Sequence, residues 1–203
     1  MIIAVDGPAA SGKGTIARAL AAHYHLPHLD TGLLYRAVGV ATVRAGLNPD
    51  DEAQAARCTD ITAHLLAEPE LRSESAGSYA SRVSRHPAVR AALFAYQQDF
   101  AQQPGGAVLD GRDIGTVIAP EADAKLFITA SAEVRARRRH LEDSHADYAA
   151  ILADIQARDA RDAGRSAAPL RQAEDADLLD TSDLTIAAAV QRAILLVEAR
   201  IRR

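Results

Sequence analysis

The chain has 203 residues, 23 Lys and Arg against 27 Asp and Glu, and a net charge of −4. This length predicts one domain that can bury a core of its own, and the mild acidity argues against a protein that coats nucleic acid or binds membranes through a basic patch. The single cysteine, Cys58, excludes an internal disulfide, and no apolar run approaches the ~18 residues of a membrane span, so we expect a cytoplasmic protein.

Short apolar segments alternate with longer helical ones along the chain. The predicted strands are residues 2–5, 26–29, 107–109, 125–129 and 177–180. The predicted helices are residues 15–24, 32–45, 87–100 and 148–165, an Arg-rich helix capped by Ser131, and a last helix from Thr185 to Ile201. Because the strands lack period-two alternation, they indicate a parallel sheet covered on both faces. The fold class is α/β with about five strands.

Residues 47–81 differ from the rest of the chain. They are polar, they contain Pro49, Pro69 and Gly77, and their helical pieces are confined to residues 54–66. This is the segment most easily interpreted as an insertion outside the core.

A glycine-rich loop follows the first strand and opens the first helix. It consists of Gly7, Pro8, Ala9, Ala10, Ser11, Gly12, Lys13, Gly14 and Thr15. Backbone N–H groups of such a P-loop surround phosphate oxygens, and Lys13 adds a point charge between the transferred and retained phosphates. The hydroxyl comes one place later than usual, and this G-K-G-T order is common among nucleoside monophosphate kinases. The loop therefore predicts nucleoside triphosphate binding.

A P-loop alone does not define the reaction, and a GTPase switch is the competing class. A switch would need an N-K-x-D segment to read its base, and no such string occurs. The chain offers only Leu-Asp-Thr-Ser at residues 179–182, so the sequence favours a kinase.

Arginines stand where a second phosphate would need them. Arg36 lies about one turn into a helix, Arg112 lies within Asp-Gly-Arg-Asp at residues 110–113, and Arg158, Arg161 and Arg165 share one helix face. Each has a plainer interpretation: a solvated helix charge, a turn with a local ion pair, and a weak surface pair of Arg158 with Asp162. Together with the P-loop, they favour an acceptor that is itself a phosphate.

Four motifs carry a family resemblance that extends from residue 2 to about residue 201. They are G-P-A-A-S-G-K-G-T, L-D-T-G-L-L-Y-R, L-D-G-R-D-I-G-T-V and I-Q-A-R-D-A-R-D-A-G-R-S-A-A-P-L. In this order they closely resemble bacterial cytidylate kinase. The resemblance implies a three-layer fold of the P-loop nucleoside monophosphate kinases and transfer of the ATP γ-phosphoryl group to CMP or dCMP with Mg²⁺. It also implies a monomer without nucleic acid or membrane partners.

The resemblance implies a function for individual residues as well. The implied catalytic residues are Lys13, Arg36, Arg112, Arg158, Asp162 and Arg165. The implied ATP ligands are the P-loop residues 7–15 with Arg138 and Arg139, and Thr15 is the candidate for the Mg²⁺ ligand, directly or through water. The implied CMP ligands are Thr31, Arg36, Ser81, Arg90, Asp110, Arg112, Asp113, Arg158, Asp162 and Arg165.

The implied organisation is a single kinase domain over residues 1–203. Its core would comprise residues 1–46, 82–139 and 151–203, with a nucleotide-binding insert at 47–81 and a short lid at 140–150. The insert is too short for the β-hairpin of enterobacterial-type members, but residues 71–73 are expected to keep its last strand end. The alternative function is another small P-loop kinase, either uridylate-accepting or of the gluconate/shikimate type.

Overall fold

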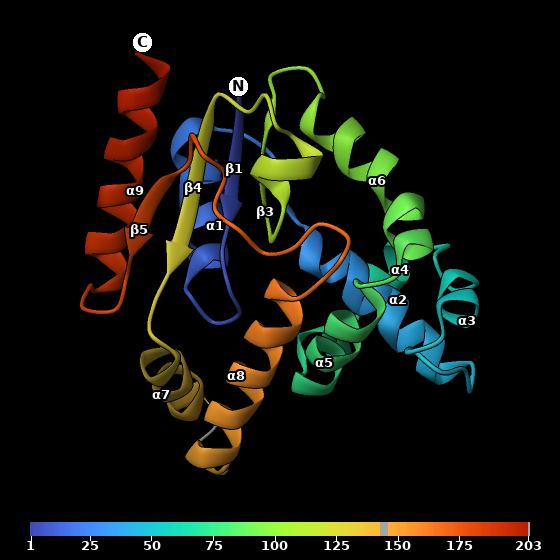
Figure 1. The fold of residues 1–203 in the computed structure, drawn as a ribbon. Helices are drawn as coiled ribbons and strands as arrows, with labels where there is room; N and C mark the ends of the chain where they lie inside the picture. The colour runs from blue at the N-terminus through green and yellow to red at the C-terminus, as the bar shows by residue number, and fades with distance from the viewer. Residues whose placement is uncertain (143–145, 203) are drawn as a thin grey trace. The chain divides into compact units, whose positions relative to one another are not determined.

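The structure is a computed structural model that describes residues 1–142 and 146–202. The chain forms two compact units, one made of Met1–Leu29 with Phe100–Arg203 and the other of Asp30–Asp99. Each unit is described by itself below (Figure 1). Residues 143–145 of the predicted lid lie outside the described residues.

A five-stranded sheet organises the first unit, and its strand order is β2-β3-β1-β4-β5. The strands are β1 (Ile2–Asp6), β2 (His28–Asp30), β3 (Ala107–Gly111), β4 (Ala124–Thr129) and β5 (Asp177–Asp180). The β1–β3, β1–β4 and β4–β5 pairs are parallel. The predicted α/β class and the five predicted strands are confirmed.

The two faces of this sheet carry different side chains because neighbouring residues of a strand point to opposite sides. Ile3 and Val5 of β1, with Leu126 and Ile128 of β4, form a buried apolar core against α1 (Lys13–Tyr24) and α9 (Ile186–Ile201). Asp6 and Lys125 are out of phase with these residues and turn to the other face. There they meet the single π-helical turn η2 (Ile114–Ile118), next to Gly115.

Helices α7 (Ala132–Glu142) and α8 (Tyr148–Ala163) pack against each other after β4 (Figure 1). Their starts follow from local side-chain caps. The Ser131 hydroxyl accepts from Val134 N at 3.2 Å, and Asp147 accepts from Ala150 N at 3.1 Å. Thr185 caps α9 in the same way. The predicted caps at Ser131 and Thr185 are confirmed.

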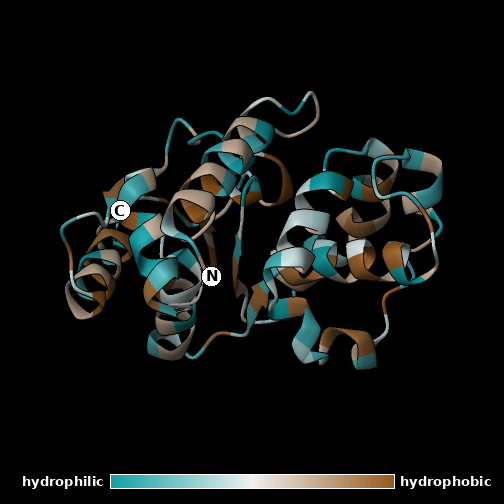
Figure 2. Cartoon of the chain, turned by 90° about the horizontal axis from the view of Figure 1, so that it is seen from below, coloured by the Kyte–Doolittle hydropathy of each residue, from teal (hydrophilic) through white to brown (hydrophobic). Residues whose placement is uncertain are grey.

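Helices make up the second unit. They are α2 (Thr31–Arg44), α3 (Glu52–Ala56), α4 (Ala63–Leu66), the 3₁₀ turn η1 (Pro69–Arg72), α5 (Glu74–Val83) and α6 (Pro87–Ala101), whose last two residues belong to the first unit. Helices α2 and α5 approach closely at Gly39, where a Cβ would lie 2.6 Å from Tyr79 Cβ. In Figure 2, hydrophobic residues in brown lie between the helices of this unit, and hydrophilic residues in teal lie on its outer turns.

The expected strand end at residues 71–73 is wrong. Pro69 opens a 3₁₀ turn there, and the fully buried Leu71 side chain joins the core of the unit. The carbonyl oxygens of Leu71 and Ser73 accept hydrogen bonds from Arg36 Nη1, so their partner is a side chain of α2 and not a neighbouring strand. The helical pieces expected within residues 54–66 correspond to α3 and α4.

Across the described residues, no helix is both long and apolar enough to span a bilayer.

Candidate active site

The glycine-rich loop joins β1 to α1 and encloses an anion site. Gly12 has a φ of +89°, a left-handed backbone that favours glycine, and a Cβ on Gly7 would lie 2.0 Å from the carbonyl oxygen of Ile128. Helix α1 begins at Lys13, so the first turn of the helix directly continues the loop, and the N–H groups of Thr15 and Ile16 donate to the Gly12 carbonyl at 3.1 Å. The predicted strand–loop–helix arrangement is confirmed, and it has the geometry that binds phosphate.

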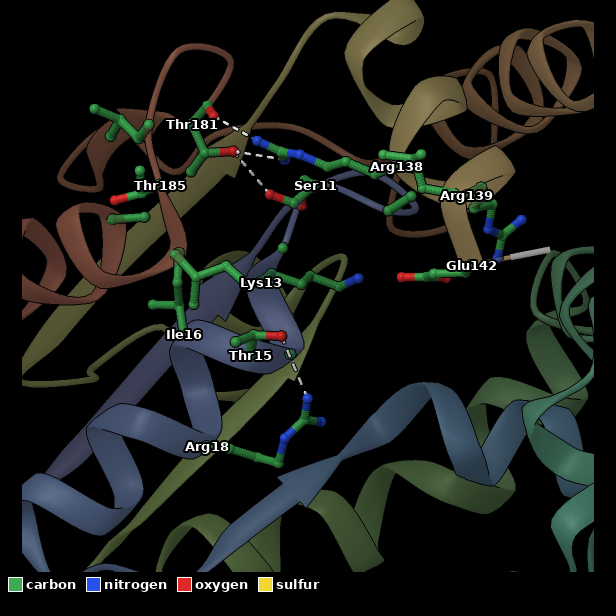
Figure 3. Close-up of a pocket in the computed structure, with 17 residues that line it drawn as sticks. Ser11, Lys13, Thr15, Ile16, Arg18, Arg138, Arg139, Glu142, Thr181 and Thr185 are labelled. Atoms are coloured by element: carbon green, nitrogen blue, oxygen red, sulfur yellow. Dashed lines mark hydrogen bonds between the residues drawn. The ribbon is translucent and has the colours of Figure 1, made fainter. Parts of the chain in front are cut away.

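A pocket of about 590 Å³ opens at this loop. Its walls are residues 10–16 and Arg18, the end of α7 from Arg138 to Glu142, and Thr181 with residues 184–186 and 189. In Figure 3, Lys13 extends into the pocket from the first turn of α1, and Arg138 and Arg139 come from α7. These cations, with Arg18, outnumber the Glu142 carboxylate among the lining residues, and this charge favours a polyphosphate.

Arg138 is held in the pocket wall by Thr181. Its guanidinium donates to the Thr181 hydroxyl at 3.1 Å and to the Thr181 carbonyl at 2.6 Å, and the hydroxyl in turn donates to the Ser11 carbonyl at 3.0 Å. Thr181 therefore connects α7 to the P-loop. Thr181 is not among the predicted site residues, because a lone hydroxyl residue directly after a strand carries no pattern. Its place at the carboxyl end of β5 is the one signal of a function.

Asp110 approaches the P-loop from β3. The two strands are adjacent, with Val5 opposite Asp110 in the register, and the predicted nearness of this segment to the loop is confirmed. Asp110 Oδ2 lies 3.0 Å from the point that a Cβ of Gly14 would occupy. A side chain at position 14 would therefore require the Asp110 carboxylate to move by a few tenths of an ångström, and this close approach favours a second glycine directly after Lys13.

Asp6 fixes the turn that follows Arg112 and Asp113. Its buried carboxylate accepts hydrogen bonds from the backbone N–H groups of Ile114 and Gly115, both at 2.8 Å. Burial raises the pKa of Asp6 to about 7, although the two N–H groups act in the opposite direction. Asp6 is not among the predicted site residues. The available signal was a carboxylate at the end of a buried strand, where it needs hydrogen-bond partners.

Arginines gather around Asp162 on α8. Asp162 Oδ2 accepts from Arg112 Nε at 2.9 Å, and its Oδ1 pairs with Arg165 at 2.7 Å. Burial alone would raise the pKa of Asp162, but the charges of Arg112, Arg165 and Arg158 outweigh burial and lower it to about 2. Asp162 is only 2% exposed and Arg158 is buried as well, so the interpretation as a weak surface pair is wrong.

The second unit holds the other predicted residues. Arg36 Nη1 donates to the Leu71 and Ser73 carbonyls at 2.7 and 2.9 Å, so Arg36 is not a solvated helix charge. The Arg90 guanidinium lies 5.7 Å from the centroid of the Tyr35 ring. Thr31, Ser81 and Arg90 are all buried within this unit.

The structure thus distributes the predicted residues over both units. In the first unit, Gly14 lies close to Asp110, and Arg138 lines the pocket at the P-loop. In the same unit, Arg112 and Arg165 contact Asp162. The second unit contains Thr31, Arg36, Ser81 and Arg90.

A divalent cation fits the P-loop only together with a bound phosphate compound. The Thr15 hydroxyl lies in the first turn of α1, lines the pocket and accepts from Arg18 Nη2 at 3.4 Å. In the part of the chain that the structure describes, no group of three or more His, Cys, Asp or Glu side chains could hold a metal ion. Mg²⁺ commonly keeps few protein ligands and binds phosphate oxygens, and one hydroxyl beside a polyphosphate pocket suits this chemistry.

The fold and the site define a class of protein. A P-loop on a parallel sheet, a cationic pocket and a cluster of arginines around Asp162 are the parts of a P-loop phosphotransferase. The cytidylate kinase family model matches residues 3–199. The chain belongs to the cytidylate kinase family, as its motifs predicted, and is a kinase.

Relatives agree with this assignment, and a solved structure shows a similar fold. The chain is 58% identical to a cytidylate kinase of Xanthobacter autotrophicus, over 98% of both chains. It is 55% identical to a cytidylate kinase of Rhodopseudomonas palustris (strain HaA2), over 98% of this chain and 96% of that one. An uncharacterized protein from Eubacterium ventriosum has a similar fold, with a TM-score of 0.60 at 16% identity and coverage of 98% and 99%. The alternative kinases are not favoured.

Proposed function

We propose that the chain carries out the reaction of its family, the transfer of the γ-phosphoryl group of ATP to CMP or dCMP, by in-line displacement. The observation that supports this most strongly is the group of Arg112, Arg158 and Arg165 around the buried Asp162, in the unit that also holds the P-loop pocket. A kinase whose acceptor is a neutral hydroxyl has no need for such a concentration of cations. A phosphate acceptor needs one, because two anions must approach each other.

The donor side of the proposal is the P-loop pocket. The P-loop, residues 7–15, binds the phosphates of ATP through backbone N–H groups, with Arg138 and Arg139 from α7. Pro8 has no N–H group, and that of Thr15 donates to the Gly12 carbonyl, so the donors are other residues of the loop. The Lys13 ammonium is a point charge on a flexible side chain, so it stays close to the phosphoryl group during its transfer. Thr15 would hold Mg²⁺, directly or through water, and the ion would supply positive charge that neutralises the phosphate oxygens.

On the acceptor side, the proposal assigns the CMP phosphate to Arg36, Arg112 and Arg165. No general base is needed, because a phosphate oxygen is already anionic near neutral pH. Catalysis then consists of alignment and charge stabilisation, in which Asp162 keeps two of these arginines in place. Arg158 and Asp162 are the proposed contacts of the sugar, and Asp110 lies beside the phosphates.

The base is assigned to Ser81, Arg90 and Asp113, with Thr31 close by. Cytosine presents an amino donor at N4 and acceptors at N3 and O2, so a carboxylate and a guanidinium match its edge. Uracil would place its O4 acceptor against Asp113 and leave polar groups unpaired, at a cost of ~1–3 kcal/mol. CMP is therefore expected to be preferred over UMP.

We expect Asp113→Asn to reduce the CMP/UMP preference, measured as the ratio of kcat/KM values, by about tenfold or more. An amide presents both a donor and an acceptor, so it accommodates O4 of uracil better than a carboxylate does. Glu121→Gln, the same change at an exposed residue, is the control and is expected to leave the ratio unchanged. A wild-type ratio in Asp113→Asn would contradict the assignment.

The function itself is tested by coupled ADP release with ATP and one acceptor at a time: CMP, dCMP, UMP, AMP or gluconate. Rapid turnover with CMP and dCMP is expected. Equal or faster turnover of UMP would contradict the cytosine assignment, and turnover of gluconate would favour the alternative kinases. We further propose that the protein acts as a cytoplasmic monomer on these small molecules, without a nucleic acid or membrane partner.

A further inference from the structure

Arg135 is a buried arginine of α7 that the proposed reaction does not use. It is 4% exposed, and its guanidinium binds three separate segments of the first unit. Nε donates to the Ala130 carbonyl at 2.8 Å, and Nη1 donates to the P-loop carbonyl of Ala9 at 3.2 Å. Nη1 and Nη2 also form a two-pronged pair with the Asp159 carboxylate of α8, at 3.0 and 2.6 Å.

The contact with Ala9 bears on the shape of the P-loop. The next residue, Ala10, has a φ of +58°, a left-handed conformation that costs free energy for any residue with a Cβ. A hydrogen bond to the carbonyl of Ala9 fixes the peptide that joins these two residues. Arg135 therefore helps to hold the loop in a backbone conformation that costs free energy.

The other contacts connect the two groups of phosphate-binding arginines. Arg138 and Arg139 follow Arg135 by three and four residues on α7, and both line the P-loop pocket. On α8, Asp159 directly follows Arg158 and precedes Asp162 by three residues, so these side chains share about one turn of helix. A single guanidinium thus joins the loop, the helix with the donor-side arginines and the helix with the acceptor-side cluster.

We propose that Arg135 and Asp159 form a positioning pair that sets the acceptor-side arginines of α8 relative to the P-loop, so that the two phosphates are aligned for transfer. This inference rests on the proposed function. Arginine suits the position because its planar fork donates in several fixed directions at once, whereas a lysine offers one point charge and cannot satisfy all three partners.

The chain contains a matched pair without this connection. Arg200 of α9 and Asp177 of β5 also form a two-pronged contact, in which Arg200 Nε and Nη2 donate to the carboxylate, both at 2.8 Å. Neither residue lines the pocket, and the Arg200 side chain is 32% exposed where that of Arg135 is 5% exposed. If Arg135 and Asp159 only stabilised the fold, the same substitutions at both pairs would have the same kind of effect. A change to one partner of a buried ion pair lowers stability whatever the pair does in the reaction, so the effect on kcat is the informative one.

The test compares Arg135→Lys and Asp159→Asn with Arg200→Lys and Asp177→Asn in the full-length chain. The readouts are kcat, the KM values for ATP and CMP, and the melting temperature. We expect kcat to fall at least tenfold in both variants of the positioning pair and to change less than twofold in both controls, with comparable losses of melting temperature. Because the two partners act as a unit, the double variant Arg135→Lys with Asp159→Asn is expected to lose little more than either single variant.

A kcat within twofold of wild type in Arg135→Lys or Asp159→Asn would overturn the proposal. If Arg135→Lys does not fold, Asp159→Asn decides the question, since the Asp159 side chain is 31% exposed and tolerates an amide. A wild-type chain without CMP-dependent ADP release would instead overturn the proposed function. In that case the affinity for ATP, measured by calorimetry, tests the positioning pair. The proposal then requires Arg135→Lys to bind ATP at least tenfold more weakly than Arg200→Lys, and equal affinities would overturn it.

Discussion

Lys13→Ala is expected to lower kcat for CMP phosphorylation by a factor on the order of 10²–10³ or more. The ammonium group extends into the P-loop pocket from the first turn of α1 (Figure 3), and its proposed role is to stabilise the charge on the transferred phosphoryl group. Removal of this charge leaves the backbone cradle intact, so ATP binding is expected to weaken much less than kcat falls. Steady-state ADP release and calorimetric ATP binding measure the two quantities separately.

Lys13→Arg sharpens this prediction. Only Lys13 and Lys125 are lysines among 23 basic residues, so the chain uses arginine almost everywhere that a cation suffices. A guanidinium is broader than an ammonium and cannot move along the same path, and we expect Lys13→Arg to recover little activity. Lys125→Arg is the control. The ammonium group of Lys125 donates to the Asp175 carboxylate and to the Pro120 carbonyl, away from the pocket. We therefore expect this substitution to change the melting temperature and not kcat. Turnover near the wild-type rate in Lys13→Ala would contradict the assignment.

Asp162→Ala is expected to be the most damaging change in the acceptor-side cluster. It leaves Arg112, Arg158 and Arg165 close together without their shared counter-charge, and removal of one partner from a buried ionic group typically costs about 3–5 kcal/mol. We expect the free energy of unfolding, measured with urea, to fall by about this amount. Turnover is also expected to fall, because the arginines no longer hold their positions. Asp154→Ala, at an exposed residue of the same helix, is the control and is expected to change neither quantity.

The same cluster predicts a dependence on pH, best measured with the milder Asp162→Asn. The pKa of Asp162 in the folded state, about 2, lies below its ordinary value of 3.8, so the folded state holds the proton less tightly than the unfolded chain does. The ionised carboxylate therefore stabilises the fold by about 2 kcal/mol above pH 4, and this contribution disappears as the pH falls through 2. The difference in unfolding free energy between wild type and Asp162→Asn should narrow over that range. A constant difference would show that the carboxylate charge does not matter.

Features with a local signal were predictable from the sequence. The P-loop, the five strands and the caps at Ser131 and Thr185 depend on glycines, apolar runs and hydroxyl residues that lie next to each other in the chain, and the structure contains them all. The strand end expected at residues 71–73 was wrong because it came from family likeness without a strand pattern of its own. There, Pro69 and the side chain of Arg36 determine the local structure.

The connecting residues of the site could not be predicted because their partners are distant in sequence. Asp6 binds N–H groups more than 100 residues away, Thr181 binds a carbonyl 170 residues away, and Arg135 reaches the P-loop across 126 residues. Such contacts form only once the parallel sheet has brought the carboxyl ends of its strands together. What each predicted residue does with ATP or CMP remains a prediction, which the variants above test.

The close approach of Asp110 to Gly14 has a consequence for the history of this kind of loop. The point that a Cβ would occupy is 3.0 Å from the carboxylate, so a side chain at position 14 and the acid at position 110 compete for the same space. A descendant that acquires serine or threonine at position 14 gains the hydroxyl of the more widespread P-loop motif, but its Asp110 carboxylate must move by a few tenths of an ångström. The two positions should therefore covary across relatives, with glycine at 14 favoured where 110 is an acid.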